Sequence, residues 1–288
     1  MSSIPLRAAL VCALVFLATI PVANASNTIR LSEIVDANGR YSTGLIKLAI
    51  QHAAPDYAIE HTGEGNMSQL RLIEEVKSGN LSIMWAGTTM EMEQTLRPVR
   101  IPLYKGLLGH RVLIIRQGQQ AAFNNIQTLE QMRGLTLGQG RTWSDTFILE
   151  ANGFHVTKAN KYGSLFYMVD GGRFDAFPRG VQEPWGEIRT RPELELTVEQ
   201  HLMMVYKMPF YLFVAPDDVE LAGILERGLR AAIEDGSFDD YFFKDPMVRD
   251  VLEKANLKNR TAFYLDNPTL SKETPLEDKT LWLDPYSL

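Results

Sequence analysis

The chain has 288 residues, 45% of them hydrophobic and 22% charged, a balance typical of a globular protein large enough for two lobes or one large domain. Its formal net charge of −6 argues against a nucleic-acid-binding protein, which usually presents a basic face. The single cysteine, Cys12, falls in an apolar leader, so a mature chain without that leader has no cysteine. Disulfides, thiolate catalysis and cysteine-ligated zinc are then excluded.

The N-terminus has the pattern of a secretory signal peptide. Arg7 precedes an apolar run over 8–20, and Ala23 and Ala25 occupy the small positions of an A-x-A cleavage site. The apolar run is shorter than the ~20 residues of a membrane span, although an uncleaved anchor is the alternative. We therefore expect cleavage after Ala25, with 1–25 as signal peptide and an exported mature chain.

Strand and helix patterns alternate along the first part of the chain. Strands are predicted at 28–35, 57–62 and 81–87. The helix between the first two strands has apolar positions at i, i+3 and i+4 and ends near Pro55. This alternation is typical of a parallel sheet with right-handed crossovers.

The same alternation continues further along. A strong strand is predicted at 110–116, and Thr128 is expected to cap a short helix, LEQMR. Strand patterns follow in GLTLGQG, HVTK and RFDAF, with helices between them and Pro178 expected to stop the pairing of the last strand. A strand over 209–216, two helices and a loosely packed tail from Asn267 complete the chain.

Five sequence pieces occur in a characteristic order. They are LRLIEEVKSGNLSIMWAGTT, IPLYKGLLGHRVLII, TLEQMRGLTLGQGRT, MVDGGRFDA and LERGLRAAIEDGSFDDYF. In this order and behind a signal peptide, they resemble the type II periplasmic solute-binding proteins, specifically the family 3 group that includes amino-acid receptors of ABC importers. The likeness covers about 28–243.

The resemblance implies an α/β fold of two lobes, each a mainly parallel sheet flanked by helices, with hinge crossovers near 109–116 and 207–214. The expected domains are lobe 1 from 26–110 and 209–266, lobe 2 from 111–208, and a C-terminal extension from 267–288. Ligands of such a fold bind outside the carboxyl ends of the strands, and closure of the lobes traps them.

The chain departs from the amino-acid clamp that this resemblance implies. Where such receptors carry an arginine for the ligand carboxylate, this chain has Glu93. Where they carry an aspartate for the ligand ammonium, it has Pro178, Arg179 and Gly180. We therefore expect a ligand other than a standard α-amino acid.

The candidate ligand-binding residues follow three strand ends. After the first come Trp85, Gly87, Thr88 and Thr89, which lie either in the cleft or in a simple turn. The turn QGRTWS could hold an anion at a helix start, or Thr142 or Ser144 could only cap the helix while Arg141 faces solvent. The candidates here are Arg141, Thr142, Trp143 and Ser144.

Arg179 and Glu183 form the third group. They could anchor a carboxylate or phosphate, or could simply pair with each other at i, i+4. The histidines show no metal-ligand spacing, and no catalytic, metal or cofactor motif is present.

The resulting hypothesis is a non-enzymatic, monomeric periplasmic receptor for a small polar or anionic solute. Its partners are that small-molecule ligand and a membrane permease of the ABC type or a sensor protein, without nucleic acid or cofactors. Two alternatives stay open: a dehydratase-like enzyme on the same scaffold, with Glu183 or Glu93 as acid or base, and an interaction protein without a ligand.

Overall fold

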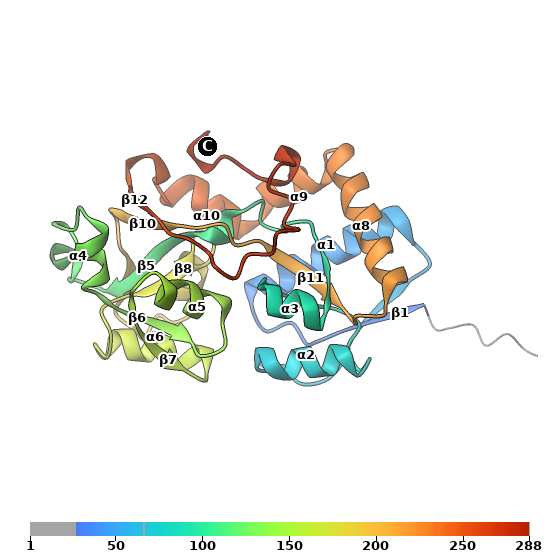
Figure 1. Cartoon of the computed structure of the whole chain (residues 1–288), viewed down its shortest axis with the longest axis horizontal. Coiled ribbons are helices and arrows are strands. Elements are labelled where there is room, and N and C mark those ends of the chain that lie inside the picture. The colour runs from blue at the N-terminus through green and yellow to red at the C-terminus, as the bar shows by residue number, and fades with distance from the viewer. Residues whose placement is uncertain (1–26, 66, 288) are drawn as a thin grey trace, which may run out of the picture.

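The computed structural model describes residues 27–65 and 67–287, so the predicted signal peptide lies outside the described residues. The described chain forms two α/β lobes that lie side by side (Figure 1). No helix in these parts of the chain combines the length and apolar character required to cross a bilayer.

Lobe 1 is built from two separated parts of the chain. Its elements are β1 (Thr28–Leu31), α1 (Ala37–Ala53), β2 (Ala58–His61), α2 (Gln69–Lys77), β3 (Met84–Gly87), α3 (Met90–Thr95), β4 (Arg97–Val99), η1 (Leu107–Gly109), β11 (Phe210–Val214), α8 (Val219–Glu234) and α9 (Ser237–Lys244). The two parts meet where α1 packs on α8. A Cβ atom on Gly228 would lie 2.0 Å from the carbonyl oxygen of Ala49, so glycine permits this close contact.

Lobe 2 comes from the middle of the chain. Its elements are β5 (His110–Arg116), η2 (Gln120–Ala122), α4 (Leu129–Arg133), β6 (Thr136–Gly140), α5 (Ser144–Ala151), β7 (His155–Ala159), α6 (Tyr162–Asp170), β8 (Phe177–Gly180), α7 (Pro184–Arg189), β9 (Leu196–Val198) and β10 (Leu202–Val205). Thr128 caps α4 as predicted, in a reciprocal capping box with Gln131.

The strand pairing is mixed. The pairs β1–β2 and β6–β7 are parallel, as expected for strands joined by helical crossovers. The strands next to the lobe junction are antiparallel: β11 lies between β3 and β4, and β5 pairs with β8, β9 and β10. The crossing segments therefore join the lobes through antiparallel pairs.

Two crossing segments lie against each other at the junction of the lobes. Tyr206 donates its backbone N–H to the carbonyl oxygen of Gly109 at 3.0 Å. A Cβ atom on Gly109 would lie 2.0 Å from the carbonyl oxygen of Tyr206, which leaves room only for glycine. Both contacts fall at the predicted hinge crossovers.

The prediction of a strand over RFDAF was wrong in its bounds, because the strand, β8, is formed by FPRG. Leu113 lies opposite Pro178 in the pairing of β5 with β8. Val181 donates to the carbonyl oxygen of His110, so the alternation of an antiparallel pair places Pro178 at a position that does not donate to β5. Proline is tolerated there, because β8 lies at the end of the sheet order.

After α9 the chain forms α10 (Pro246–Lys254), η3 (Leu257–Asn259) and β12 (Thr261–Tyr264), and the C-terminal extension from Asn267 contains η4 (Lys279–Leu281) and η5 (Pro285–Ser287). The prediction of a loosely packed tail from Asn267 was also wrong, because Thr274 and Leu281 of this tail are buried. β12 adds to β10 as a parallel strand, and the chain then crosses the middle of the molecule towards α3 (Figure 1).

We call residues 265–283 the strap, because they contact both lobes. On lobe 2, the Asn152 side chain donates to the carbonyl oxygen of Asp266 at 2.7 Å. On lobe 1, Met90 at the start of α3 donates its backbone N–H to the carbonyl oxygen of Thr269 at 2.8 Å. The strap thus supplies a backbone acceptor to the first N–H group of α3.

Candidate functional site

The candidate site lies between the lobes, where the loops after β3 and β6 face each other. The Ser144 hydroxyl, at the start of α5, donates to the carbonyl oxygen of Gly87 at 2.9 Å. Neither Thr142 nor Ser144 caps α5: Trp143 is the N-cap residue and makes no side-chain cap bond. The predicted capping role is therefore replaced by a hydrogen bond that joins the two lobes.

The threonines after β3 are used within lobe 1. Thr89 caps α3 by accepting from the backbone N–H of Met92 at 3.1 Å. The Thr88 hydroxyl donates to Oε1 of Glu93 at 2.8 Å, and Oε2 of Glu93 pairs with Arg100 at 2.7 Å. Glu93, at the place where the resemblance predicted an arginine, is thus a buried carboxylate that already has partners.

Arg179 is buried and is paired with two carboxylates. Its Nη2 lies 2.6 Å from Oε1 of Glu187 and 2.9 Å from Oε1 of Glu183, and its Nε lies 2.9 Å from Oε2 of Glu187. The guanidinium carbon also lies 5.2 Å from the centroid of the Trp143 ring, at cation–π distance. The i, i+4 pair with Glu183 therefore exists, but inside the protein rather than on its surface.

Glu187 shares Arg179 with a second carboxylate, and its pKa is raised. Burial raises the pKa of Glu187, Arg179 opposes that rise, and Glu183 adds to it. Tyr162 also donates to Glu187, at 2.6 Å. The carboxylates around Arg179 are thus in excess of the positive charge that they share.

A second buried arginine, Arg111 on β5, completes the charged cluster. It pairs with Asp145 of α5, donates from Nε to the Tyr206 hydroxyl at 3.0 Å, and has Nη1 at 3.6 Å from Oε2 of Glu183. Burial acts to lower the pKa of Arg111, but Asp145, Tyr206 and Glu183 together raise it. Arg111 therefore stays charged in spite of its burial.

Glu183 connects this cluster to lobe 1. Its Oε2 accepts from the backbone N–H of Gly180 at 2.8 Å, and its Oε1 accepts from the Asn38 side chain at 2.9 Å. Tyr104 in turn donates to Oδ1 of Asn38 at 2.6 Å. The carboxylate of Glu183 is consequently a bridge between the lobes.

Several buried polar atoms beside β8 have no hydrogen-bond partner within the described chain. They are Nη1 of Arg111, Oε1 of Gln139, and both side-chain amide atoms of Gln182. Gln139 reaches this region through its Nε2, which donates to the carbonyl oxygen of Pro178 at 3.2 Å. An unpaired buried polar group costs about 1–3 kcal/mol, so this cluster favours a polar partner that the protein itself does not supply.

The structure brings six of the ten predicted site residues to the junction of the lobes. Thr88, Ser144, Arg179 and Glu183 are buried at or near the lobe junction, and Gly87 and Trp143 contact it. Arg141, in contrast, is exposed and donates to Oδ1 of Asn160 within its own lobe at 2.8 Å.

Trp85 packs against the hydrophobic core, and Thr142 is half-buried in the turn between β6 and α5. Arg111, Asp145, Tyr206, Gln139 and Gln182 were not among the predicted site residues. The signal for Arg111 was a charged residue directly before the apolar run 112–115 of a strand, where a buried charge requires a partner.

Comparison with known proteins shows the fold. No protein-family model and no curated protein sequence matches this chain. An ancestral arginine-binding protein bound to arginine matches with a TM-score of 0.58 at 17% identity, over 76% of this chain and 98% of that one. A histidine kinase sensor domain with similarity to periplasmic binding proteins matches with a TM-score of 0.60 at 14% identity, over 76% and 96%.

A third structure is an ancestral amino-acid-binding protein, a precursor of cyclohexadienyl dehydratase. It matches with a TM-score of 0.57 at 14% identity, over 76% of this chain and 95% of that one. The predicted two-lobed type II periplasmic-binding-protein fold is thereby confirmed. About three quarters of this chain aligns with almost the whole length of each neighbour. The remaining quarter of this chain has no counterpart in them.

Proposed function

We propose that the protein binds a small polar solute between its two lobes, as an exported receptor of the periplasmic-binding-protein fold. The observation that carries this proposal is the group of buried, unpaired polar atoms of Arg111, Gln139 and Gln182. They adjoin a junction whose contacts, from Ser144 to Gly87 and from Asn38 to Glu183, join opposite lobes. A polar ligand there would satisfy these atoms and favour the closed form.

The charges of the site favour a ligand that carries a cationic group. Two arginines, Arg111 and Arg179, face three carboxylates, those of Asp145, Glu183 and Glu187, so the cluster has one negative charge in excess. A simple anion would have to displace a carboxylate from Arg179. An amine or guanidinium with a neighbouring oxygen would instead complement the excess carboxylate and Nη1 of Arg111, which makes no hydrogen bond and lies 3.6 Å from Glu183.

This chemistry is compatible with the solved neighbours, since one of them binds arginine. The way of binding would nevertheless differ from the family's clamp, because Glu93 is already paired with Arg100. We propose that the solute reaches a permease or a sensor protein through this receptor, and that the mature chain acts in the periplasm.

A thermal-shift screen tests the proposal with ligands matched in size. Arginine, its decarboxylated amine agmatine, a dicarboxylate and a neutral sugar would be added separately to the mature chain. A ligand that binds only the folded state raises the melting temperature by mass action, and we expect the cationic compounds to raise it most. A shift by the dicarboxylate alone would contradict the charge argument, and no shift with any compound would favour the interaction-protein alternative.

Gln182→Leu provides the matched variant. Replacement of an unpaired buried amide by an apolar group of similar size should stabilise the unliganded protein by about 1–3 kcal/mol. It should also abolish the thermal shift, because the ligand loses both amide contacts. Higher stability with an unchanged ligand response would show that the unpaired atoms do not serve ligand binding.

A further inference from the structure

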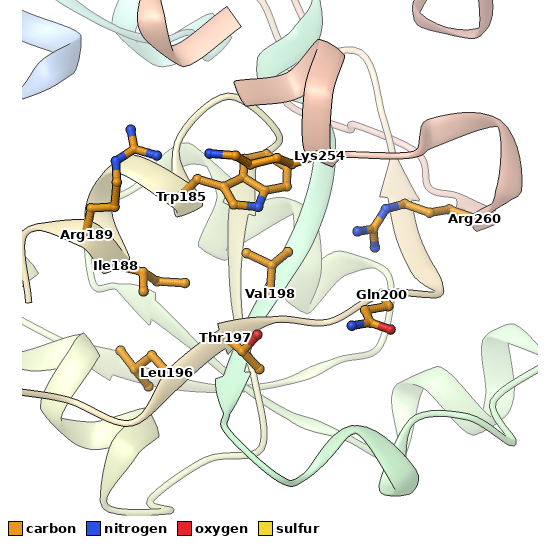
Figure 2. Close-up of a pocket in the computed structure, with 9 residues that line it drawn as sticks. All are labelled: Trp185, Ile188, Arg189, Leu196, Thr197, Val198, Gln200, Lys254 and Arg260. Atoms are coloured by element: carbon orange, nitrogen blue, oxygen red, sulfur yellow. The ribbon is translucent and has the colours of Figure 1, made fainter. Parts of the chain in front are cut away.

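A cavity lies in lobe 2, outside the junction of the lobes. Its volume is about 370 Å³, within the range of about 300–1,000 Å³ that small-molecule sites occupy. Residues of α7 and β9 form one side, and Lys254 at the end of α10 and Arg260 just before β12 form the other (Figure 2). We call it the lobe-2 pocket.

The body of the lobe-2 pocket is apolar. Ile188 of α7 and Leu196 and Val198 of β9 line it, beside the indole ring of Trp185 (Figure 2). Apolar walls of this kind bind the hydrocarbon part of a ligand, with about 25 cal/mol gained per Å² of apolar surface that leaves water.

Two hydrogen-bond donors in this pocket have no partner among the described residues. Arg260 donates from Nε to the carbonyl oxygen of Ala255 at 2.7 Å and from Nη1 to those of Glu199 and Leu202 at 2.7 and 2.9 Å. Its Nη2 is thereby left over, and the guanidinium points towards Val198 (Figure 2). The indole N–H of Trp185 also points towards Val198. Arg260 is thus held rigidly by two of its nitrogens while the third is available.

The pocket carries an excess of positive charge although the chain as a whole is acidic. Arg189 lies 2.7 Å from Oδ2 of Asp250, which Lys254 also contacts, so one carboxylate serves two cations. Arg260 lies 3.6 Å from Glu199. Three cations therefore face two carboxylates, and burial lowers the pKa of Arg260 while Glu199 only opposes that change.

We propose that the lobe-2 pocket binds a small carboxylate with an apolar body. The carboxylate would accept from Nη2 of Arg260 and from the indole N–H of Trp185, while the body packs against Ile188, Leu196 and Val198. Free donors at one end, an aliphatic wall at the other and one positive charge in excess fit this class of ligand. The site is separate from the solute site between the lobes and does not depend on its existence.

The test compares two probes that share a body and differ in charge, 4-phenylbutyrate and 4-phenylbutanol. Calorimetric titration of the mature chain should show that the carboxylate binds at least about tenfold more tightly than the alcohol, since a charge-assisted hydrogen bond is about twice as strong as a neutral one. Val198→Trp fills the pocket without touching a charged residue and should abolish binding. Gln182→Leu, between the lobes, should leave probe binding unchanged.

Trp185→Phe keeps an aromatic wall and removes the indole N–H, so the carboxylate should bind several-fold more weakly while the alcohol is unaffected. Circular dichroism would establish that each variant is folded, and Ile188→Trp replaces Val198→Trp if the latter is not. Equal affinity for both probes, binding that survives a filled pocket, or no saturable binding of the carboxylate in the millimolar range would each overturn the proposal.

Discussion

Two sets of contacts join the lobes, and they differ in kind. Between the lobes, the contacts are side-chain bonds such as Ser144 to Gly87, set among paired charges and unpaired polar atoms. Along the strap, backbone groups of Thr269 and Leu283 bond to backbone groups of Met90 and Lys105 in lobe 1, and the Asn152 side chain of lobe 2 bonds to the backbone of Asp266. The side-chain bonds beside the site can be exchanged for bonds to a ligand, whereas the bonds of the strap do not involve the site. The lobes are therefore held together by one set of contacts that a ligand can change, those beside the site, and by one that it cannot, those of the strap.

Arg111→Met should cause the largest effect, because it removes the cation from a buried cluster. Asp145 would be left as an uncompensated buried charge, which costs about 3–5 kcal/mol in the free energy of unfolding. Urea denaturation of the unliganded chain measures this change.

Arg71→Met is the matched control, since Arg71 pairs only at the surface, with Glu64 and Glu75, and should cost less than about 1 kcal/mol. The double variant Arg111→Met/Asp145→Leu should recover most of the lost stability. Equal losses of stability in the two single arginine variants would show that the buried cluster stabilises the protein no more than a surface ion pair does.

The second prediction concerns pH and the hinge. Burial lowers the pKa of His110 from 6.5 to about 4, against a hydrogen bond to the carbonyl oxygen of Gly106 that raises it. Because the folded state disfavours protonation of His110, the contribution of His110 to the free energy of unfolding is complete above pH 6.5. It is lost as the pH falls towards 4. Between pH 7.5 and pH 5 the loss should be about 2 kcal/mol.

Unfolding of wild type and His110→Asn at both pH values isolates this contribution from that of the carboxylates. The variant should lose about 2 kcal/mol less than wild type over the same pH interval. Parallel pH profiles for the two proteins would mean that His110 does not titrate between the two states.

Trp282→Ala should loosen the strap while the site between the lobes stays intact. The Trp282 indole donates to the carbonyl oxygen of Pro275 at 2.8 Å, and Lys207 lies 5.5 Å from its ring. Loss of both should lower the free energy of local opening by about 2 kcal/mol. Hydrogen exchange of residues 265–283 should accelerate and that of α5 should not, whereas faster exchange throughout the chain would show that the two components are not separable.

Ser144→Ala should give the smallest effect, because it removes one neutral hydrogen bond between the lobes. We expect a loss of about 1 kcal/mol in urea denaturation. Ser78→Ala removes an exposed bond to the carbonyl oxygen of Glu75 and should cost less. A larger effect from Ser78 would contradict a specific role for the bond across the junction.

The sequence predicted best what local patterns determine. The strand at 110–116 is present as β5, because its apolar run contains the β-branched residues Val112, Ile114 and Ile115, which favour a strand. Thr128 was predicted to cap the short helix LEQMR, and it caps α4 in a capping box with Gln131. Pro178 was misjudged, since tolerance of proline depends on which neighbour a strand has, and that is set by the whole sheet.

The site was predicted only in part for a similar reason. Gly87, Ser144 and Arg179 were predicted as site residues because the sequence places them at or after strand ends, which meet at one edge in an α/β fold. In the structure Gly87 is the last residue of β3 and Arg179 lies within β8. The partners of Arg111 could not be found, because Asp145 and Tyr206 are distant in the chain and meet it only through tertiary structure. That Arg179 binds a ligand stays a prediction, and a ligand there would have to compete with Glu183 and Glu187, which already pair with it.

The strap has a kinetic consequence. A ligand held between the lobes leaves only when they separate, and separation stretches a segment bonded to Asn152 on one lobe and to Met90 on the other. The strap therefore adds to the barrier for dissociation without contacting the ligand. We expect it to prolong the residence time of the ligand and to slow its capture in the same way, so that a loosened strap changes both rates more than the dissociation constant.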